Sequence, residues 1–198
     1  MTHRAAPLPP SARSLLILWG AMGTGKSTVG ACVGRLAQAE FTDLDAVIVA
    51  ETNMSISAIV QGFGEARFRA LERASLERVL DAAPSERRKA AASSGGMRVG
   101  ATRRVVALGG GTLLDPELRA RALRESFVVV LEADAATLAE RVQGGERPLL
   151  AADASAARIA RLLVERATVY AEGHAHVPTA GVSVADVAER VCRLWVSG

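Results

Sequence analysis

The sequence is poor in aromatic residues, which make up 4% of its 198 residues, although 49% of the residues are hydrophobic. Its core must therefore be built mainly from alanine, valine and leucine. The hydrophobic content excludes an intrinsically disordered chain, and the length suits one compact domain.

Cysteine is also scarce. Cys32 and Cys192 lie far apart and show no metal-like spacing. This excludes a disulfide framework and favours a reducing, cytoplasmic compartment. No apolar run approaches the length of a membrane span, so no membrane association is expected. Residues 1–13 contain three prolines and lack the apolar centre of a signal peptide, which predicts a flexible leader.

Only two lysines, Lys26 and Lys89, are found among the 24 basic residues. The formal net charge of +3 is mild and fits a protein with or without anionic ligands. Arginine occupies nearly every cationic position, yet Lys26 lies within a glycine-rich segment. A lysine at this position, in a chain that otherwise uses arginine, indicates that the glycine-rich segment specifically requires a compact positive charge.

Short apolar runs alternate with helical patterns along the chain. We expect strands at 14–19, 40–47, 103–108, 126–133 and 176–179, with a helical pattern over 55–82. This alternation predicts an α/β fold with three layers, in which a five-stranded, mainly parallel sheet has helices on both faces. Ligands of such sheets bind at the carboxyl ends of the strands.

The segment GAMGTGKS, from Gly20 to Ser27, satisfies the P-loop pattern G-x-x-x-x-G-K-[ST] between a strand and a helix. Its backbone N–H groups would hold phosphate oxygens, Lys26 would reach the β- and γ-phosphates, and the Ser27 hydroxyl would bind Mg²⁺. A P-loop alone does not distinguish a kinase from an ATPase, a GTPase or a nucleotide sensor. The N/T-K-x-D pattern that reads guanine is missing, which argues against a GTPase.

FTDLDAV places Asp43 and Asp45 two residues apart. At strand period both carboxylates would point the same way, one toward a metal-bound water and one toward the proton of a substrate hydroxyl. An ordinary acidic turn is an equally good interpretation.

Two further segments have both a structural and a functional interpretation. Arg69 lies among Glu65 and Glu72 at helical spacing, which is typical of a surface ion-pair ladder. The triple glycine 109–111 follows the third strand, where it would allow close approach of a ligand or serve as a hinge.

The carboxyl-terminal third supplies further candidates. Residues 142–153 have the composition of a glycine-hinged lid that carries Arg147 over the nucleotide. Arg166 lies one helical turn before Tyr170. It is either a candidate site residue or the partner of a nearby glutamate in an ion pair. His174 and His176 are too few for a metal site and are expected in a loop or at a sheet edge.

Taken together, these motifs resemble the shikimate kinase family. The matching segments are GAMGTGKSTVG, FTDLD, SISAIVQGFGEARFRALE, GGG, RPLL and ERATVY, in the family's order, and they span residue 14 to about residue 180. The resemblance implies an ATP-dependent kinase that phosphorylates the 3-hydroxyl of shikimate, with ATP and Mg²⁺ as cofactors.

The resemblance also implies a role for each matching residue. ATP would be bound by Gly23, Thr24, Gly25, Lys26, Ser27, Thr28, Arg141 and Arg147, and Mg²⁺ by Ser27 and, through water, Asp43. Shikimate would be bound by Asp45, Arg69, Gly109, Gly110, Gly111 and Arg166. Among these, Lys26, Asp45 and Arg147 would be catalytic: Asp45 as the base, and Arg147 as an arginine finger on the lid.

One domain is expected over 14–198, with a helical substrate-binding lobe at about 45–82. An inserted segment at about 84–102, rich in alanine, serine, glycine and arginine, departs from the family pattern. It is interpreted as a solvated loop, with a basic contact to nucleic acid or another polyanion as the alternative. A monomer without nucleic-acid partners is expected.

Two other functions remain open from the sequence. One is another small-molecule P-loop kinase, such as a gluconate-kinase-like enzyme, against which the triple glycine and the pair Arg69 and Arg166 argue. The other is a kinase-like sensor without turnover, although the chain keeps Lys26, Asp43, Asp45 and Arg147.

Overall fold

The computed structural model describes residues 14–82, 103–143 and 155–197. Its helices and strands, in chain order, are β1 (Leu15–Trp19), α1 (Lys26–Leu36), β2 (Glu40–Asp43), α2 (Leu44–Thr52), α3 (Ile56–Asp81), β3 (Arg104–Ala107), η2 (Thr112–Leu114), α5 (Pro116–Glu125), β4 (Phe127–Glu132), α6 (Ala135–Gln143), α7 (Ala156–Tyr170), β5 (Ala175–Pro178) and α8 (Val184–Ser197).

The five strands form one parallel sheet in the order β2-β3-β1-β4-β5. β1 lies at its centre, and Leu18 pairs with Ala107 of β3 and Val129 of β4. All five residues of β1 are buried. A strand with helices on both faces needs such a continuous apolar run, and the predicted α/β fold is confirmed.

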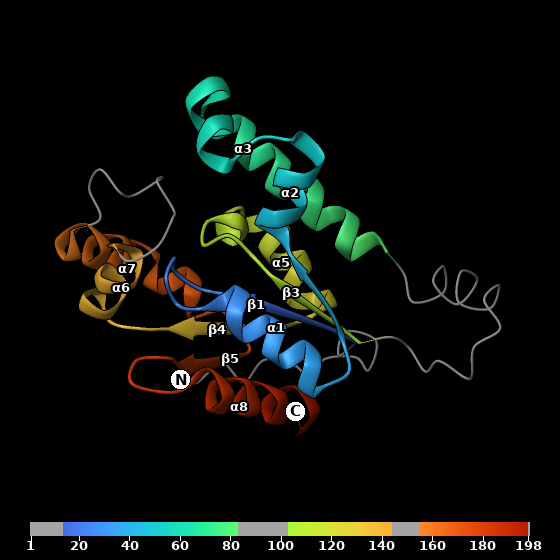
Figure 1. Cartoon of the computed structure of the whole chain (residues 1–198). Coiled ribbons are helices and arrows are strands. Elements are labelled where there is room, and N and C mark those ends of the chain that lie inside the picture. The colour runs from blue at the N-terminus through green and yellow to red at the C-terminus, as the bar shows by residue number, and fades with distance from the viewer. Residues whose placement is uncertain (1–13, 83–102, 144–154, 198) are drawn as a thin grey trace.

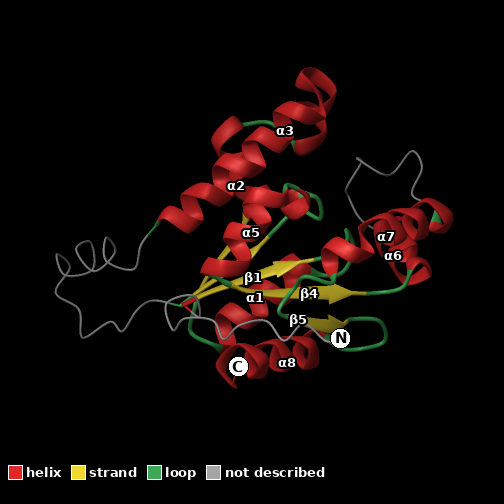
Figure 2. Cartoon of the chain, turned by 180° about the vertical axis from the view of Figure 1, so that it is seen from behind, coloured by secondary structure: helices red, strands yellow, loops and turns green. Residues whose placement is uncertain are grey.

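Alternate residues of β1 enter two separate cores. Leu15, Ile17 and Trp19 pack with residues of α3, α5 and α7 on one face. Leu16 and Leu18 pack with α1 and α8 on the other. Figures 1 and 2 show the sheet between these two helical layers. Because successive side chains of β1 point to opposite faces of the sheet, this one strand contributes to the cores on both sides.

Helices α2 and α3 project from the sheet as an arm (Figure 1). They share a small apolar cluster of Ile48, Ile59 and Phe68, separate from the two main cores. Asp43 caps α2 and Ser55 caps α3 by accepting hydrogen bonds from backbone N–H groups. The arm corresponds to the lobe expected at 45–82, whose role in substrate binding stays a prediction.

One expected element boundary in this region is wrong. The strand expected over 40–47 ends at Asp43, because the Asp43 side chain caps a helix that begins at the next residue. The helical pattern expected over 55–82 is confirmed by α3, which is kinked at Gly64, whose φ of 83° and ψ of 163° are not helical. Glycine is the residue that adopts such a φ without strain.

Gly20 shows why the chain turns sharply after β1. A Cβ at this position would lie 2.2 Å from the carbonyl oxygen of Leu131, and the φ of Gly20 is 129°. Any side chain would therefore collide with β4. The P-loop must begin with glycine here for β1 and β4 to remain paired at their carboxyl ends.

Three segments singled out in the sequence analysis lie wholly or mostly outside the residues that the structure describes. The leader 1–13, the inserted segment 84–102 and residues 144–153 of the expected lid lie outside the described residues, whereas residues 142 and 143 belong to α6. Both cysteines are free thiols, as expected.

Within the described residues no single helix is long and apolar enough to cross a membrane. Only α2 and α3 taken together, with a bend of 92° between them, have the length and apolar composition of a membrane span.

His174 and His176 lie where the sequence predicts, in the bend before β5 and in this edge strand. The ring of His174 stacks on Phe127, and its Nδ1 accepts a 2.9 Å hydrogen bond from the backbone N–H of Val128. Burial lowers the pKa of His174 below its usual value of 6.5, and a hydrogen bond to the backbone of Leu123 partly opposes the change. The folded protein therefore favours the neutral imidazole.

Acidification is expected to destabilise the fold through His174. Below pH 6.5 the unfolded chain binds a proton that the folded chain resists, so stability is present above pH 6.5 and falls as the pH drops toward the lowered folded pKa. Thermal unfolding at pH 7.5 and at pH 5.5 measures this loss. His174→Asn keeps a hydrogen-bond acceptor but cannot titrate, so its melting temperature should fall less with acid than that of the wild type. His176→Asn should retain the wild-type loss, and an equal acid loss in His174→Asn would contradict the assignment.

Candidate active site

The P-loop connects β1 to α1 at the centre of the sheet. The backbone of Gly25 is left-handed, with a φ of 89°, and α1 begins at the next residue, Lys26. The Lys26 side chain is 8% exposed, and its Nζ donates hydrogen bonds to the carbonyl oxygens of Gly20 (2.9 Å) and Ala21 (2.8 Å). The ammonium group is therefore held over the loop, at the positive end of α1, where anionic phosphate binds favourably.

Helix α6 supports the P-loop from the side. Val142 and Leu138 lie within 3.4 Å of where a Cβ of Gly23 would be. The guanidinium of Arg141 donates to the carbonyl oxygen of Gly23 (3.3 Å) and to both the hydroxyl (3.0 Å) and the carbonyl oxygen (2.8 Å) of Thr179. Arg141 thus links the P-loop to the segment after β5, and its predicted contact with adenine stays a prediction.

The triple-glycine turn, Gly109–Gly111, follows β3 and lies beside the P-loop. A Cβ on Gly110 would lie 3.1 Å from the carbonyl oxygen of Gly20. A Cβ on Gly109 would lie 2.3 Å from Oε1 of Glu72, and one on Gly111 would lie 2.5 Å from Nη1 of Arg69. A side chain at Gly110 would crowd the P-loop backbone, and one at Gly109 or Gly111 would displace the Glu72 carboxylate or the Arg69 guanidinium.

The turn brings several predicted site residues together. The Asp45 carboxylate Oδ1 would lie 3.4 Å from a Cβ of Gly109, so α2 delivers this carboxylate to the turn. Arg69 reaches the same turn from α3. Asp45, Arg69 and the three glycines therefore form one site next to the first residues of the P-loop.

Asp43 and Asp45 do not alternate along a strand, and that part of the prediction is wrong. Asp43 ends β2, whereas Asp45 lies in the first turn of α2. Oδ1 of Asp43 accepts hydrogen bonds from the backbone N–H groups of Asp45 (3.0 Å) and Ala46 (3.4 Å). Asp43 therefore fixes the start of the helix that carries Asp45, in addition to any role at the metal.

Arg69 is held by two carboxylates of different exposure. Its Nη2 lies 2.7 Å from Glu65, whose side chain is 68% exposed, and its Nη1 lies 2.5 Å from Glu72, whose side chain is 1% exposed. The other oxygen of Glu72 accepts a 2.5 Å hydrogen bond from the hydroxyl of Thr112. The expected surface ladder is therefore half correct: Glu65 lies on the surface, and Glu72 is buried beneath the site.

The charge of Arg69 is maintained despite its partial burial. Burial acts to lower the pKa of the guanidinium, but the carboxylates of Glu72 and Glu65 outweigh it, so the pKa is raised. A charged guanidinium with exposed surface at the triple-glycine turn is suited to bind a substrate carboxylate.

Tyr170 joins α7 to the same turn. Its hydroxyl donates a 3.0 Å hydrogen bond to the carbonyl oxygen of Gly110, and its ring meets Trp19 edge-on with 4.7 Å between centroids. Burial raises the pKa of Tyr170, while hydrogen bonding and charge from Arg166, and the charge of Arg69, oppose the rise. Arg166, on α7, and Arg69, on α3, therefore both lie near enough to the Tyr170 hydroxyl for their charge to act on its pKa.

The oxygen groups near the P-loop suit Mg²⁺ better than a metal that needs many protein ligands. Among the residues that the structure describes, no group of three or more His, Cys, Asp or Glu side chains could hold a metal ion. Mg²⁺ is usually bound through one or two protein oxygens together with substrate phosphates and water. Ser27, in the first turn of α1, and Asp43, at the end of β2, offer such oxygens.

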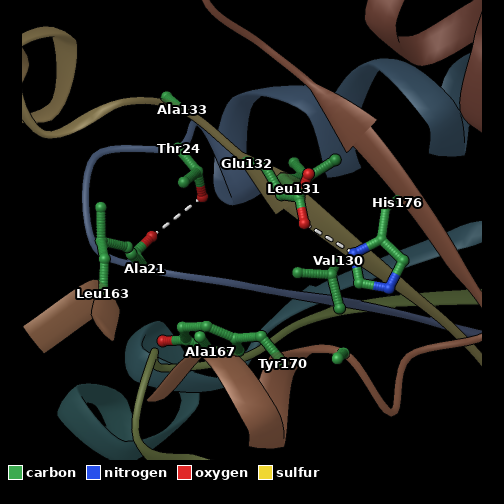
Figure 3. Close-up of a pocket in the computed structure, with 11 residues that line it drawn as sticks. Ala21, Thr24, Val130, Leu131, Glu132, Ala133, Leu163, Ala167, Tyr170 and His176 are labelled. Atoms are coloured by element: carbon green, nitrogen blue, oxygen red, sulfur yellow. Dashed lines mark hydrogen bonds and ion pairs between the residues drawn. The ribbon is translucent and has the colours of Figure 1, made fainter. Parts of the chain in front are cut away.

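A cavity of about 260 Å³ lies between the P-loop, the end of β4 and α7 (Figure 3). Its lining is mostly apolar and includes Ala21, Leu163 and the ring of Tyr170. Its polar side chains are already engaged, since Thr24 donates to Ala21 (2.9 Å) and His176 lies 2.6 Å from Glu132. Of the predicted site residues that the structure describes, only Thr24 lines it, and Tyr170 connects it to the triple-glycine turn through the hydrogen bond to Gly110.

Glu72, Thr112 and Tyr170 are site residues that the sequence interpretation did not assign. Each had a weak signal: Glu72 lies three residues after Arg69, Thr112 directly follows the glycines, and Tyr170 is the only tyrosine of the chain. Arg147, predicted on the lid, lies outside the described residues.

Comparisons with known proteins agree with this geometry. A family model described as shikimate kinase matches residues 22–102 and 97–195. The shikimate kinase of Geobacter sulfurreducens is 37% identical over 183 residues, covering 92% of this chain and 91% of that protein. A shikimate kinase of Thermus thermophilus is 35% identical over 189 residues, covering 94% and 92%.

Solved structures show the same relationship. The shikimate kinase of Acinetobacter baumannii in complex with shikimate superposes with a TM-score of 0.78 at 26% identity, covering 92% of this chain and 93% of that chain. A gluconokinase from Sinorhizobium meliloti has a TM-score of 0.57 at 17% identity, covering 94% and 93%, which shows a shared fold alone.

Proposed function

The chain belongs to the shikimate kinase family, and we propose that it transfers the γ-phosphate of ATP to the 3-hydroxyl of shikimate, giving shikimate 3-phosphate and ADP. One observation carries the proposal: Asp45, Arg69 and Tyr170 meet at the triple-glycine turn, and Gly110 of this turn packs against Gly20 at the start of the P-loop. An acceptor bound there has a base and a carboxylate-binding cation beside the loop that holds the transferred phosphate.

The residues at the triple-glycine turn bind shikimate and prepare its hydroxyl for phosphorylation. Arg69, together with Arg166, holds the carboxylate of shikimate, while Gly109, Gly110 and Gly111 allow its ring to approach the backbone. Asp45 accepts the proton of the 3-hydroxyl as its oxygen attacks the γ-phosphorus, and the bond from phosphorus to the bridging oxygen of ADP breaks. The fixed geometry aligns the two reactants, which is the main requirement of phosphoryl transfer.

The donor is ATP, bound by the P-loop residues Gly23, Thr24, Gly25, Lys26, Ser27 and Thr28. Lys26 would exchange its contacts with loop carbonyls for phosphate oxygens. Ser27 and, through water, Asp43 would hold Mg²⁺, which when bound neutralises charge on the phosphates. Arg147 would add a second cation to the transferred phosphoryl group, and Arg141 would lie against adenine.

Location and partners are also part of the proposal. The predicted monomeric state stays a prediction. The two free thiols support a cytoplasmic location, where cysteines stay reduced. The acceptor site is built to bind a small anion, and this supports a function that needs no nucleic-acid partner.

A phosphorylation assay tests the function. The purified chain with ATP and Mg²⁺ is offered shikimate, quinate or gluconate separately, and phosphorylated product and ADP are quantified. Phosphorylation of shikimate in clear preference to the other two is expected. Turnover of gluconate without shikimate would identify another small-molecule kinase, and ATP binding without any phosphoryl transfer would identify a sensor.

A further inference from the structure

We propose that Tyr170 is a positioning residue of the acceptor site, whose hydroxyl fixes the triple-glycine turn and the guanidinium of Arg166 relative to the P-loop. The inference builds on the proposed function, because it assigns Tyr170 a role in shikimate binding.

The contacts of Tyr170 place it between the two halves of the active site. Its hydroxyl donates to the carbonyl oxygen of Gly110 at 3.0 Å, and the side chain is 7% exposed. Gly110 is itself packed against the carbonyl oxygen of Gly20, the first residue of the P-loop. One hydrogen bond therefore connects α7 to the point where the acceptor site meets the phosphate-binding loop.

The ring of Tyr170 packs against another aromatic ring on one side and borders a cavity on another. One side meets Trp19 edge-on, at 4.7 Å between centroids. Another part of the ring lines the cavity of about 260 Å³ behind the P-loop (Figure 3). On the side that the cavity leaves open, the hydrogen bond to Gly110 adds to the packing that fixes the ring.

The hydroxyl also organises charge at the site. Arg166 lies one helical turn before Tyr170 on α7, close enough for its guanidinium to act on the Tyr170 hydroxyl and lower the pKa of Tyr170 against the effect of burial. A hydroxyl that donates to Gly110 keeps its lone pairs available to accept from a guanidinium. Tyr170 can therefore hold the Gly110 carbonyl and accept from Arg166 simultaneously.

Tyr170→Phe removes only the hydroxyl. Because Arg166 and the Gly110 turn lose a common anchor, we expect the KM for shikimate to rise about tenfold, while the KM for ATP changes less than twofold. A merely structural hydroxyl would lower stability without separating the two KM values.

Ser126→Ala is the matched control. Ser126 is fully buried at the start of β4, and its hydroxyl donates a 2.6 Å hydrogen bond to Ala122, at the opposite end of the sheet. Both variants should lose a few degrees of melting temperature, but only Tyr170→Phe should raise the KM for shikimate. Equal KM values in Tyr170→Phe and the wild type, or equal increases in both variants, would overturn the inference.

A second measurement leaves the chain unmutated. Since Tyr170 is the only tyrosine, labelling with 3-fluorotyrosine gives one ¹⁹F resonance. Saturating shikimate in the presence of ADP should shift this resonance, and an unshifted resonance would overturn the inference. If the unlabelled wild type phosphorylates quinate or gluconate but not shikimate, or no acceptor at all, the proposed function fails and this inference fails with it. Shikimate turnover with no ¹⁹F shift refutes the inference alone.

Discussion

Asp45→Asn is expected to reduce turnover of shikimate by about 10²–10⁴-fold while the chain still folds and binds ATP. Asparagine has nearly the same shape as aspartate, so the first turn of α2 and its cap by Asp43 should persist. The amide cannot take the proton of the attacking hydroxyl. The loss should therefore fall on kcat, with the affinity for ATP unchanged.

Steady-state kinetics with both substrates varied, together with direct titration of ATP, separates these effects. Asp81→Asn is the control, because Asp81 lies at the far end of α3, where it pairs with Arg121. It should turn over shikimate at the wild-type rate. A kcat within threefold of wild type in Asp45→Asn would show that Asp45 is not the base, and loss of ATP affinity would show that it acts at the nucleotide instead.

The sequence predicts the sheet well because its signals are local. The run LLILW has the continuous apolar character of a strand buried on both faces, and the glycine-rich segment directly after it indicates a turn into a helix. Asp115 with Pro116 likewise marks the start of α5, since Asp115 accepts from the N–H groups of Glu117 and Leu118. Such features need only the neighbouring residues to be recognised.

The sequence fails where a local pattern fits two structures equally well, or where an outcome depends on distant contacts. The spacing of Asp43 and Asp45 suits a strand, but the capping bonds of Asp43 start a helix between them. The spacing of Arg69 and Glu72 suits an exposed ladder, but β3 brings Thr112 beneath Glu72 and buries it. Helical periodicity cannot show which end of an ion pair is covered by another element.

The buried position of Glu72 leads to the second large effect. Glu72→Gln keeps the size of the side chain but removes the charge that Arg69 faces at 2.5 Å. The guanidinium would keep only Glu65, which lies in solvent, and should turn away from the triple-glycine turn. We expect the KM for shikimate to rise about 10- to 100-fold and the KM for ATP to stay within twofold, since a buried charge-assisted bond is lost.

Glu65→Gln is the matched control, because it removes the other carboxylate of the same guanidinium. The Glu65 side chain is 68% exposed, and exposed pairs at helical spacing contribute only a few tenths of a kcal/mol. Its KM for shikimate should therefore change by about twofold or less. The KM values of the two variants for shikimate and ATP, with melting temperatures measured alongside, show which carboxylate orients Arg69. If Glu65→Gln weakens shikimate binding as much as Glu72→Gln does, the orientation of Arg69 does not depend on the buried carboxylate. A clear difference between them would mean that α3 presents Arg69 to the acceptor because Glu72, held by Thr112, fixes its guanidinium from below.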